Sequence, residues 1–217
     1  GVQITTKSID PAKMAVTVAL EGSLQEKDTV QISILDGDKV LAQGWGTDIV
    51  MNLADVTLWG ERTPKLYQCQ VILYDEKQEV VDLVTESFGI RQISVSNQGL
   101  FINGQETFLR GGCVHHDNGI LGAAGFAEAE WRRVAMLKEA GFNAIRSSHN
   151  PASPHMLEAA DALGMYVMDE TWDMWFKHKN PKDYAGSFMD NFKEDAKAMV
   201  MRDYNHPSVI MYSIGNE

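Results

Sequence analysis

Four short apolar segments in the second half of the chain each lead into a group of polar residues, and helical sequence separates them. The apolar segments are residues 108–114, 142–146, 165–168 and 209–213. The polar groups that follow are His115-His116-Asp117, Arg146-Ser147-Ser148-His149-Asn150, Asp169-Glu170 and Asn216-Glu217. Alternating strands and helices predict a parallel sheet, and polar residues at successive strand ends predict one active-site rim. The pattern favours the first half of a (β/α)8 barrel, the TIM barrel.

The segments between these strands carry helix signals. Residues 128–140 place apolar side chains at helical spacing, and Gly141 stands where helices commonly end. Ser153-Pro154 supplies an N-cap and a proline at the first helical position of the next helix, which Gly164 closes. A doubly wound nucleotide-binding sheet has the same element order, but no glycine-rich phosphate loop follows the first strand.

The first 92 residues follow a different pattern, in which short β segments are separated by turn residues. The predicted strands are residues 13–20, 29–35, 40–45, 49–53, 66–74 and 80–88. About seven short strands in such a length indicate an immunoglobulin-like β-sandwich. We therefore expect a multi-domain chain, with an all-β sandwich at residues 1–92 and half of a TIM barrel at residues 93–217. In the second part, Asn103-Gly104 predicts a tight hairpin turn.

Charge and composition exclude some partners. The 217 residues carry a net charge of −11, which would repel a phosphate backbone, so we expect no nucleic-acid partner. No apolar run approaches the roughly 18–20 residues that span a bilayer, so we expect no membrane partner either. Cys69 and Cys113 fall in different predicted domains, which argues against a disulfide framework.

Three longer stretches carry a family resemblance. Residues 143–151 (NAIRSSHNP) with 161–168 (DALGMYVM), and residues 203–217 (DYNHPSVIMYSIGNE), resemble the two signatures of the family 2 glycoside hydrolases, which include β-galactosidases and β-glucuronidases. Residues 85–91 (TESFGIR) resemble the junction between the family's sandwich and barrel. The sequence departs from the family where Asn150 replaces a common Tyr and Tyr212 a common Trp.

The resemblance implies a retaining β-glycosidase, which uses one carboxyl group as acid/base and a second as nucleophile. Glu217 matches the acid/base, and its pKa should be raised by burial and by the second carboxylate. The family's nucleophile comes from a later strand, beyond residue 217. We therefore expect the chain to be a fragment that is inactive alone.

The resemblance also implies a set of substrate-binding residues. Asn216 would hydrogen-bond the sugar 2-hydroxyl, and Arg146 would orient the carboxylates. The remaining candidates are His149 and His115 as sugar contacts, Asp169 as a supporting carboxylate and Trp175 as a stacking ring. Residues 114–119 (VHHDNG) look closer to β-galactosidases, and β-glucuronidase or β-mannosidase specificity is the alternative.

Two further expectations and two rival hypotheses concern cofactors, function and partners. We expect no cofactor or metal, because Met174 stands where some β-galactosidases have a magnesium-binding Glu. A metallohydrolase site built from His115, His116, Asp117 and His149 is one rival. A non-catalytic carbohydrate-binding or interaction module is another. A half barrel exposes strand edges and apolar faces, which predicts self-association into a homo-oligomer.

Overall fold

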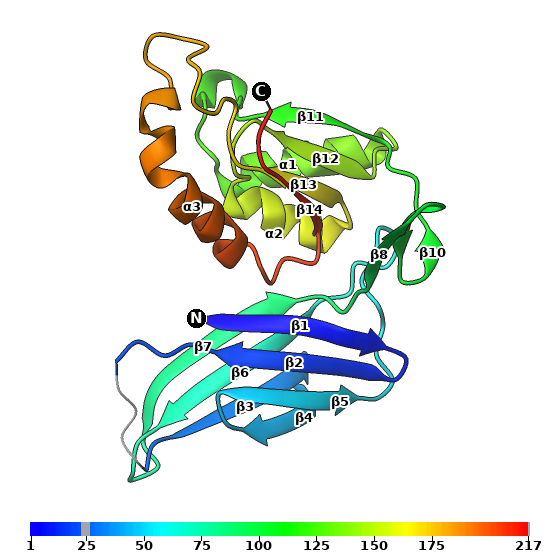
Figure 1. Cartoon of the computed structure of the whole chain (residues 1–217). Coiled ribbons are helices and arrows are strands. Elements are labelled where there is room, and N and C mark those ends of the chain that lie inside the picture. Colours follow the sequence, from blue (N-terminus) through cyan, green and yellow to red (C-terminus); the bar gives the residue numbers. More distant parts are fainter. Residues whose placement is uncertain (23–26, 217) are drawn as a thin grey trace. The chain divides into compact units, whose positions relative to one another are not determined.

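The computed structural model describes residues 1–22 and 27–216, which form two compact units, residues 1–107 and 108–217. The first unit is a β-sandwich with one sheet of β1 (Val2–Ile9), β2 (Ala12–Val18) and β5 (Asp48–Leu53). The facing sheet has the order β4 (Lys39–Trp45), β3 (Thr29–Asp36), β6 (Tyr67–Tyr74) and β7 (Val80–Phe88), all antiparallel (Figure 1). Strands β2 to β7 coincide with the six predicted strands, and β1 is a seventh.

The sandwich core follows from period-two alternation along these strands. Val16, Ile32, Ile34 and Cys69 are completely buried between the sheets. Tyr67, at the start of β6, accepts a hydrogen bond of 2.8 Å at its hydroxyl from the backbone N–H of Thr57. This contact is a tyrosine corner, a feature of immunoglobulin-like sandwiches.

A small three-stranded sheet follows, made of β8 (Ile93–Ser96), β9 (Gly99–Ile102) and β10 (Gln105–Glu106). Asn103 and Gly104 both have positive φ, +54° and +75°, so they form the predicted tight turn. The Asn103 side chain donates to the carbonyl of Trp59 at 3.0 Å. By its contacts this sheet belongs with the sandwich, although it follows the boundary that the sequence predicts at residues 92 and 93.

The second unit is a parallel sheet whose strands lie in chain order: β11 (Gly111–His115), β12 (Ala144–Ser148), β13 (Tyr166–Glu170) and β14 (Val209–Ser213). The connections contain η1 (Gly119–Leu121) with α1 (Ala127–Glu139), then α2 (Pro154–Leu163), then α3 (Ala185–Arg202). Each strand is the neighbour of its predecessor, as in a (β/α)8 barrel, whereas a doubly wound sheet reverses its order at a switch point.

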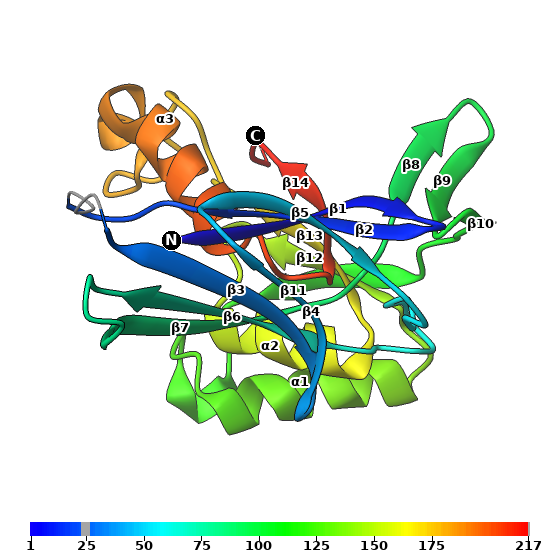
Figure 2. The same cartoon turned by 90° about the horizontal axis from the view of Figure 1, so that it is seen from below.

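The predicted helix signals operate locally. Ser153 Oγ accepts a hydrogen bond from the N–H of Met156 at 3.1 Å, with Pro154 at the first position of α2. Gly164 ends α2 in the left-handed conformation. Helices α1 and α2 run side by side (Figures 1 and 2). None of the described helices is both long and apolar enough to cross a bilayer.

The two faces of the parallel sheet have different surroundings. Ile145 and Val167 belong to the core that α1 and α2 cover, together with Val134 and Leu157 of those helices. A hollow of about 300 Å³ is lined by Cys113, Arg146, Met168 and Met211 among others. Residues that alternate along each strand therefore divide between the helix-covered core and the interior of the half barrel.

Candidate active site

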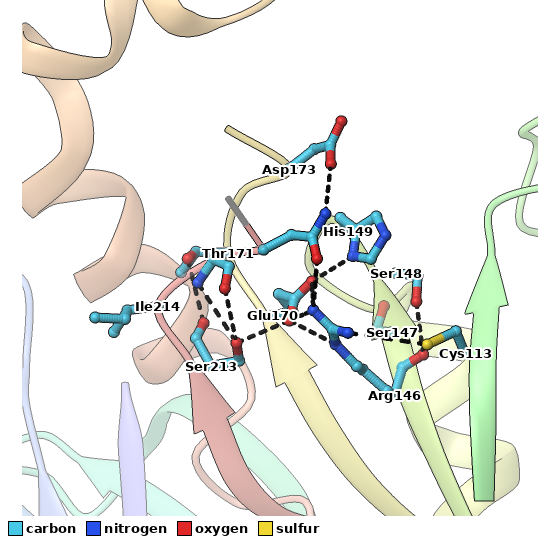
Figure 3. A network of polar contacts seen from close by, with 12 residues as sticks. Cys113, Arg146, Ser147, Ser148, His149, Glu170, Thr171, Asp173, Ser213 and Ile214 are labelled. Carbon is cyan, nitrogen blue, oxygen red and sulfur yellow. Dashed lines mark hydrogen bonds and ion pairs between the residues drawn. The ribbon is translucent and has the colours of Figure 1, made fainter. Parts of the chain in front are cut away.

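The carboxylate of Glu170, at the end of β13, is the centre of the polar network in Figure 3. Its Oε1 accepts one hydrogen bond from Arg146 Nη2 at 3.0 Å and another from His149 Nδ1 at 2.6 Å. Its Oε2 accepts from Arg146 Nε at 2.8 Å and from Ser213 Oγ at 2.8 Å. Four donors from β12, the segment after it and β14 thus converge on one completely buried carboxylate.

This environment holds Glu170 in its charged form. Burial acts to raise the pKa of Glu170, but the hydrogen bonds from His149, Ser213 and Arg146 outweigh it, so the pKa lies below its usual value. Because an ionised carboxylate only accepts hydrogen bonds, His149 must donate from Nδ1. Its Nε2 is then free to act as an acceptor in the neutral ring.

Asn216 extends the network toward the chain's last residues. Its Oδ1 accepts a hydrogen bond from Arg146 Nη2 at 3.1 Å, and its Nδ2 donates to Asp173 Oδ1 at 3.1 Å. Asp173 also accepts from Lys179 Nζ at 2.7 Å, and this contact is the largest cause of its lowered pKa. The oxygen and the nitrogen of the Asn216 amide are therefore both held, and within residues 1–22 and 27–216 one N–H and one lone pair have no further partner.

The His115 ring, on the rim of β11, meets the His149 ring edge to face with centroids 5.2 Å apart. The two histidines come from neighbouring strand ends, as the sequence predicts. His115 is exposed, whereas His149 is half-buried because Glu170 holds it. Their contact with a sugar stays a prediction.

Trp175 lies against the segment that follows β14. Its indole Nε1 donates to the carbonyl of Ile214 at 2.8 Å, and the side chain is 38% exposed. A Cβ on Gly215 would lie 2.5 Å from this nitrogen, and Gly215 has a φ of +129°. Glycine is thus required at this position, and Trp175 supports the backbone that leads to Asn216.

Asp169 is the one candidate that the structure places elsewhere. Successive side chains of a strand point to opposite faces, so Asp169 and Glu170 diverge. Asp169 is completely buried, and its Oδ1 accepts the backbone N–H of Ala152 at 2.8 Å. It lies outside the Glu170 network, and its expected role as a supporting carboxylate of the sugar site stays a prediction. Glu170 is the carboxylate that organises the site.

The geometry gives little support to a metal site. Within residues 1–22 and 27–216, no three His, Cys, Asp or Glu side chains come together in a way that could hold a metal ion. Met174, at the position of the family's magnesium-binding Glu, is buried and offers a thioether where Mg²⁺ prefers oxygen ligands. The residues present do not fit that magnesium site.

Comparison with known proteins decides the family. Residues 93–217 match the family model described as glycosyl hydrolases family 2, TIM barrel domain, and residues 1–91 match the model described as glycosyl hydrolases family 2. This chain belongs to glycosyl hydrolase family 2. The predicted fold class, a sandwich followed by part of a TIM barrel, is confirmed.

Relatives of this family 2 chain carry several names. The β-galactosidase BoGH2A of Bacteroides ovatus is 38% identical over the whole chain, and a β-glucuronidase of Streptococcus agalactiae is 32% identical over the whole chain. A solved family 2 structure from Bacteroides cellulosilyticus has 40% identity and a TM-score of 0.93 over the whole chain. The chain spans 27%, 38% and 30% of the lengths of these three proteins, respectively.

The acid/base assigned to Glu217 lies outside the described residues. The sequence brought forward Arg146, His149, His115, Asn216 and Trp175, and these residues do gather around the ends of β11 to β14. It missed the central position of Glu170 and the roles of Ser213 and Asp173. For Ser213 a signal existed, because Glu170 and Ser213 are register partners across β13 and β14.

Proposed function

We propose that this chain supplies the acid/base half of the active site of a retaining β-glycosidase that hydrolyses terminal β-linked sugars. The observation that carries the proposal is the Glu170 network, which holds Arg146 and, through it, Asn216 directly before Glu217. Membership of glycosyl hydrolase family 2 and relatives named β-galactosidase and β-glucuronidase support it.

In this mechanism Glu217 donates a proton to the leaving oxygen, and a second carboxylate attacks the anomeric carbon from the opposite side. The two carboxyl groups of a retaining enzyme stand about 5–5.5 Å apart. Glu217 then removes a proton from the water that hydrolyses the glycosyl-enzyme. The nucleophile is assigned to a later strand of the whole protein, so the 217-residue chain alone is expected to be inactive.

The other groups bind the sugar and orient the carboxylates. The free N–H and lone pair of Asn216 suit the sugar 2-hydroxyl, a contact that strengthens in the transition state. Nε2 of His149 can accept a hydrogen bond that a sugar hydroxyl donates, and the His115 ring lies beside the His149 ring. Arg146 keeps Asn216 and Glu170 in a fixed relation because its guanidinium reaches both.

Among possible substrates, we propose a β-galactoside. The cations Arg146 and Lys179 already pair with Glu170 and Asp173, so they are poorly placed to receive the extra carboxylate of a glucuronide. β-Glucuronidase or β-mannosidase activity on the same fold is the alternative. A non-catalytic carbohydrate-binding module is the alternative from another class.

The test is hydrolysis of aryl β-galactoside, β-glucuronide, β-mannoside and β-glucoside by the full-length protein, with the anomer of the first product followed by NMR. We expect cleavage of the galactoside with retention at the anomeric carbon. Cleavage of another glycoside of the panel would change the proposed substrate and leave the proposed mechanism unchanged. No cleavage, together with measurable sugar binding, would favour the binding-module alternative.

A further inference from the structure

A second group of charged side chains surrounds Asp169, on the opposite face of β13 from Glu170. Asp169 and Asp203 are both completely buried. Asp203 directly follows α3, and its carboxylate accepts from Arg202 Nε at 2.6 Å and Nη2 at 2.7 Å. Two carboxylates are thus buried near a single guanidinium, which is hydrogen-bonded to Asp203. This arrangement is unusual because a buried charge needs a partner of its own.

Both backbone groups of Ala152 are held by this group. Its N–H donates to Asp169 Oδ1 at 2.8 Å, and its carbonyl accepts from Arg202 Nη2 at 2.6 Å. We call Asp169, Ala152, Arg202 and Asp203 the Ala152 clamp. Ala152 stands three residues after His149, so the clamp and the His149–Glu170 contact secure the two ends of one short segment, residues 149–152.

The charges of the clamp do not balance if both carboxylates are ionised. Arg202 is engaged with Asp203, and Asp169 Oδ2 is buried with no hydrogen-bond partner among the described residues. Burial, followed by the neighbouring Asp203 carboxyl, raises the pKa of Asp169 to about 7, although the Ala152 N–H and Arg202 act in the opposite direction.

The next charged groups are His206 and Asp161, which form a pair of their own. His206 Nδ1 lies 2.6 Å from Asp161 Oδ2. Burial, the largest single influence, acts to lower the pKa of His206, but the hydrogen bond and charge of Asp161 and the charges of Asp203 and Glu158 together raise it. Because the Asp203 charge is one of these influences, a change in the charge of Asp203 would also change the pKa of His206. Asp161 already compensates a positive charge on His206, so His206 does not compensate a negative charge on Asp169. Protonation of Asp169 is the simplest way to remove that negative charge.

We propose that Asp169 is a positioning residue of the site, kept as a neutral carboxylic acid that shares its proton with Asp203, and that the Ala152 clamp fixes His149 against Glu170. The catalytic part of this inference rests on the proposed function, because His149 is assigned there to the sugar. Loss of the proton places a second negative charge beside Asp203. The ionised Asp169 carboxylate then draws Arg202 away from the Ala152 carbonyl. Residues 149–152 become loose as a result.

The sign of the pH dependence follows from the raised pKa. Folding takes up one proton between the ordinary pKa of an Asp, 3.8, and the folded value of about 7. The stabilisation that the neutral Asp169 provides is complete at low pH and is lost as the pH rises through about 7. Residues 149–152 are therefore well ordered in weak acid and open more often in weak base.

The test compares Asp169→Asn and Asp169→Ala with wild type in the full-length protein, with Glu139→Gln as an exposed control. An Asn keeps the acceptor for Ala152 and offers a neutral donor to Asp203, so it mimics the protonated acid. The first readout is amide hydrogen exchange of His149, Asn150 and Ala152, corrected for intrinsic rates; Pro151 has no N–H. Wild type should lose about tenfold in protection between about pH 6 and about pH 8.

Asp169→Asn should stay protected at both pH values, whereas Asp169→Ala should be unprotected at both. Equal pH dependence in Asp169→Asn and wild type, or full protection in Asp169→Ala, would overturn the inference. If Asp169→Ala does not fold, the comparison of Asp169→Asn with wild type still decides.

The second readout is the pH profile of kcat/KM on the glycoside that the panel identifies. Asp169→Asn should move the loss of activity to higher pH, which a purely structural change would not do, while Glu139→Gln should leave the profile unchanged. An unshifted profile would contradict the positioning role. If wild type cleaves no glycoside, the proposed function fails by itself, and the exchange experiment still tests the clamp.

Discussion

Asp169 and Glu170 are consecutive residues of β13, yet their carboxyl groups hold the same short segment from opposite faces of the sheet. Glu170 Oε1 lies 2.6 Å from His149 Nδ1, and Asp169 Oδ1 lies 2.8 Å from the Ala152 N–H. Because adjacent strand residues point to opposite faces, the pair can secure both ends of residues 149–152. The position of His149 thus depends on β13 through two separate contacts.

Glu170→Gln should disrupt the site more than any other single change on this rim. The substitution leaves Arg146 without its anionic partner and keeps only one of the two acceptor oxygens, so an NH2 group must face either His149 Nδ1 or Ser213 Oγ. Neutralising one partner of a buried ion pair costs about 3–5 kcal/mol, and the partial exposure of Arg146 lowers our expectation to about 2–3 kcal/mol. Denaturant unfolding of this chain measures the cost, with Glu158→Gln as control; a change below about 0.5 kcal/mol would contradict the central place of Glu170.

Acid should weaken the wild-type chain partly through Glu170. Its pKa lies below the ordinary value of 4.5, so its stabilisation is present above pH 4.5 and is lost as the pH falls through the folded value. We expect Glu170→Gln to flatten the fall of unfolding free energy in that window. Unfolding curves measured at several acidic pH values check this. Parallel wild-type and variant slopes would show that Glu170 does not titrate as described.

Gly215→Ala should impair the approach to Asn216. A Cβ there would meet Trp175 Nε1 at 2.5 Å and the Trp172 carbonyl at 3.2 Å, on a backbone with φ of +129°. Forcing a side chain into such a conformation costs about 1–3 kcal/mol, so either the backbone or Trp175 must move. We expect kcat of the full-length protein to fall by about 5- to 150-fold if the whole of this cost appears in the transition state. The double variant Gly215→Ala with Trp175→Ala should recover part of the loss; no recovery would mean that Trp175 is not the obstacle.

Tyr67→Phe should weaken the sandwich without changing the chemistry. The substitution removes the hydroxyl that accepts the Thr57 N–H and leaves that donor without its partner. We expect a loss of about 1–2 kcal/mol in unfolding free energy and an unchanged KM in the full-length protein. Tyr74→Phe, in the same strand, removes a hydroxyl that donates a longer hydrogen bond of 3.4 Å to Gln31 Oε1, and is the matched control. Equal losses in both variants would argue against a special role for the corner.

Most of the barrel elements were predictable because their signals are local. Ser153-Pro154 and Gly164 mark the ends of α2 in the sequence and in the structure. The first two strands begin two to three residues later than the apolar runs suggest. The reason is a side chain: Asn143 accepts the Arg110 N–H at 2.6 Å and donates to the Phe108 carbonyl at 2.9 Å, so it takes the place of ladder hydrogen bonds there.

The site was predictable only in part. The sequence places two acids at the end of β13, and their period-two alternation shows that they diverge, but not which one faces the half-barrel interior. That choice depends on how the whole strand is oriented by Val167, which packs with the α1 and α2 core. The same limitation hid the Ala152 clamp, whose members come from separate parts of the chain: Ala152 lies 17 residues from Asp169 and 50 residues from Arg202.

The measurement that tests the central claim most directly is azide rescue of Glu217→Ala in the full-length protein. On an aryl glycoside with a good leaving group, the variant should form the glycosyl-enzyme but hydrolyse it slowly, because no base activates water. Added azide needs no base, so it should restore turnover and yield a β-glycosyl azide of retained configuration. Wild-type activity in Glu217→Ala, or a loss that azide does not restore, would contradict the acid/base role of Glu217.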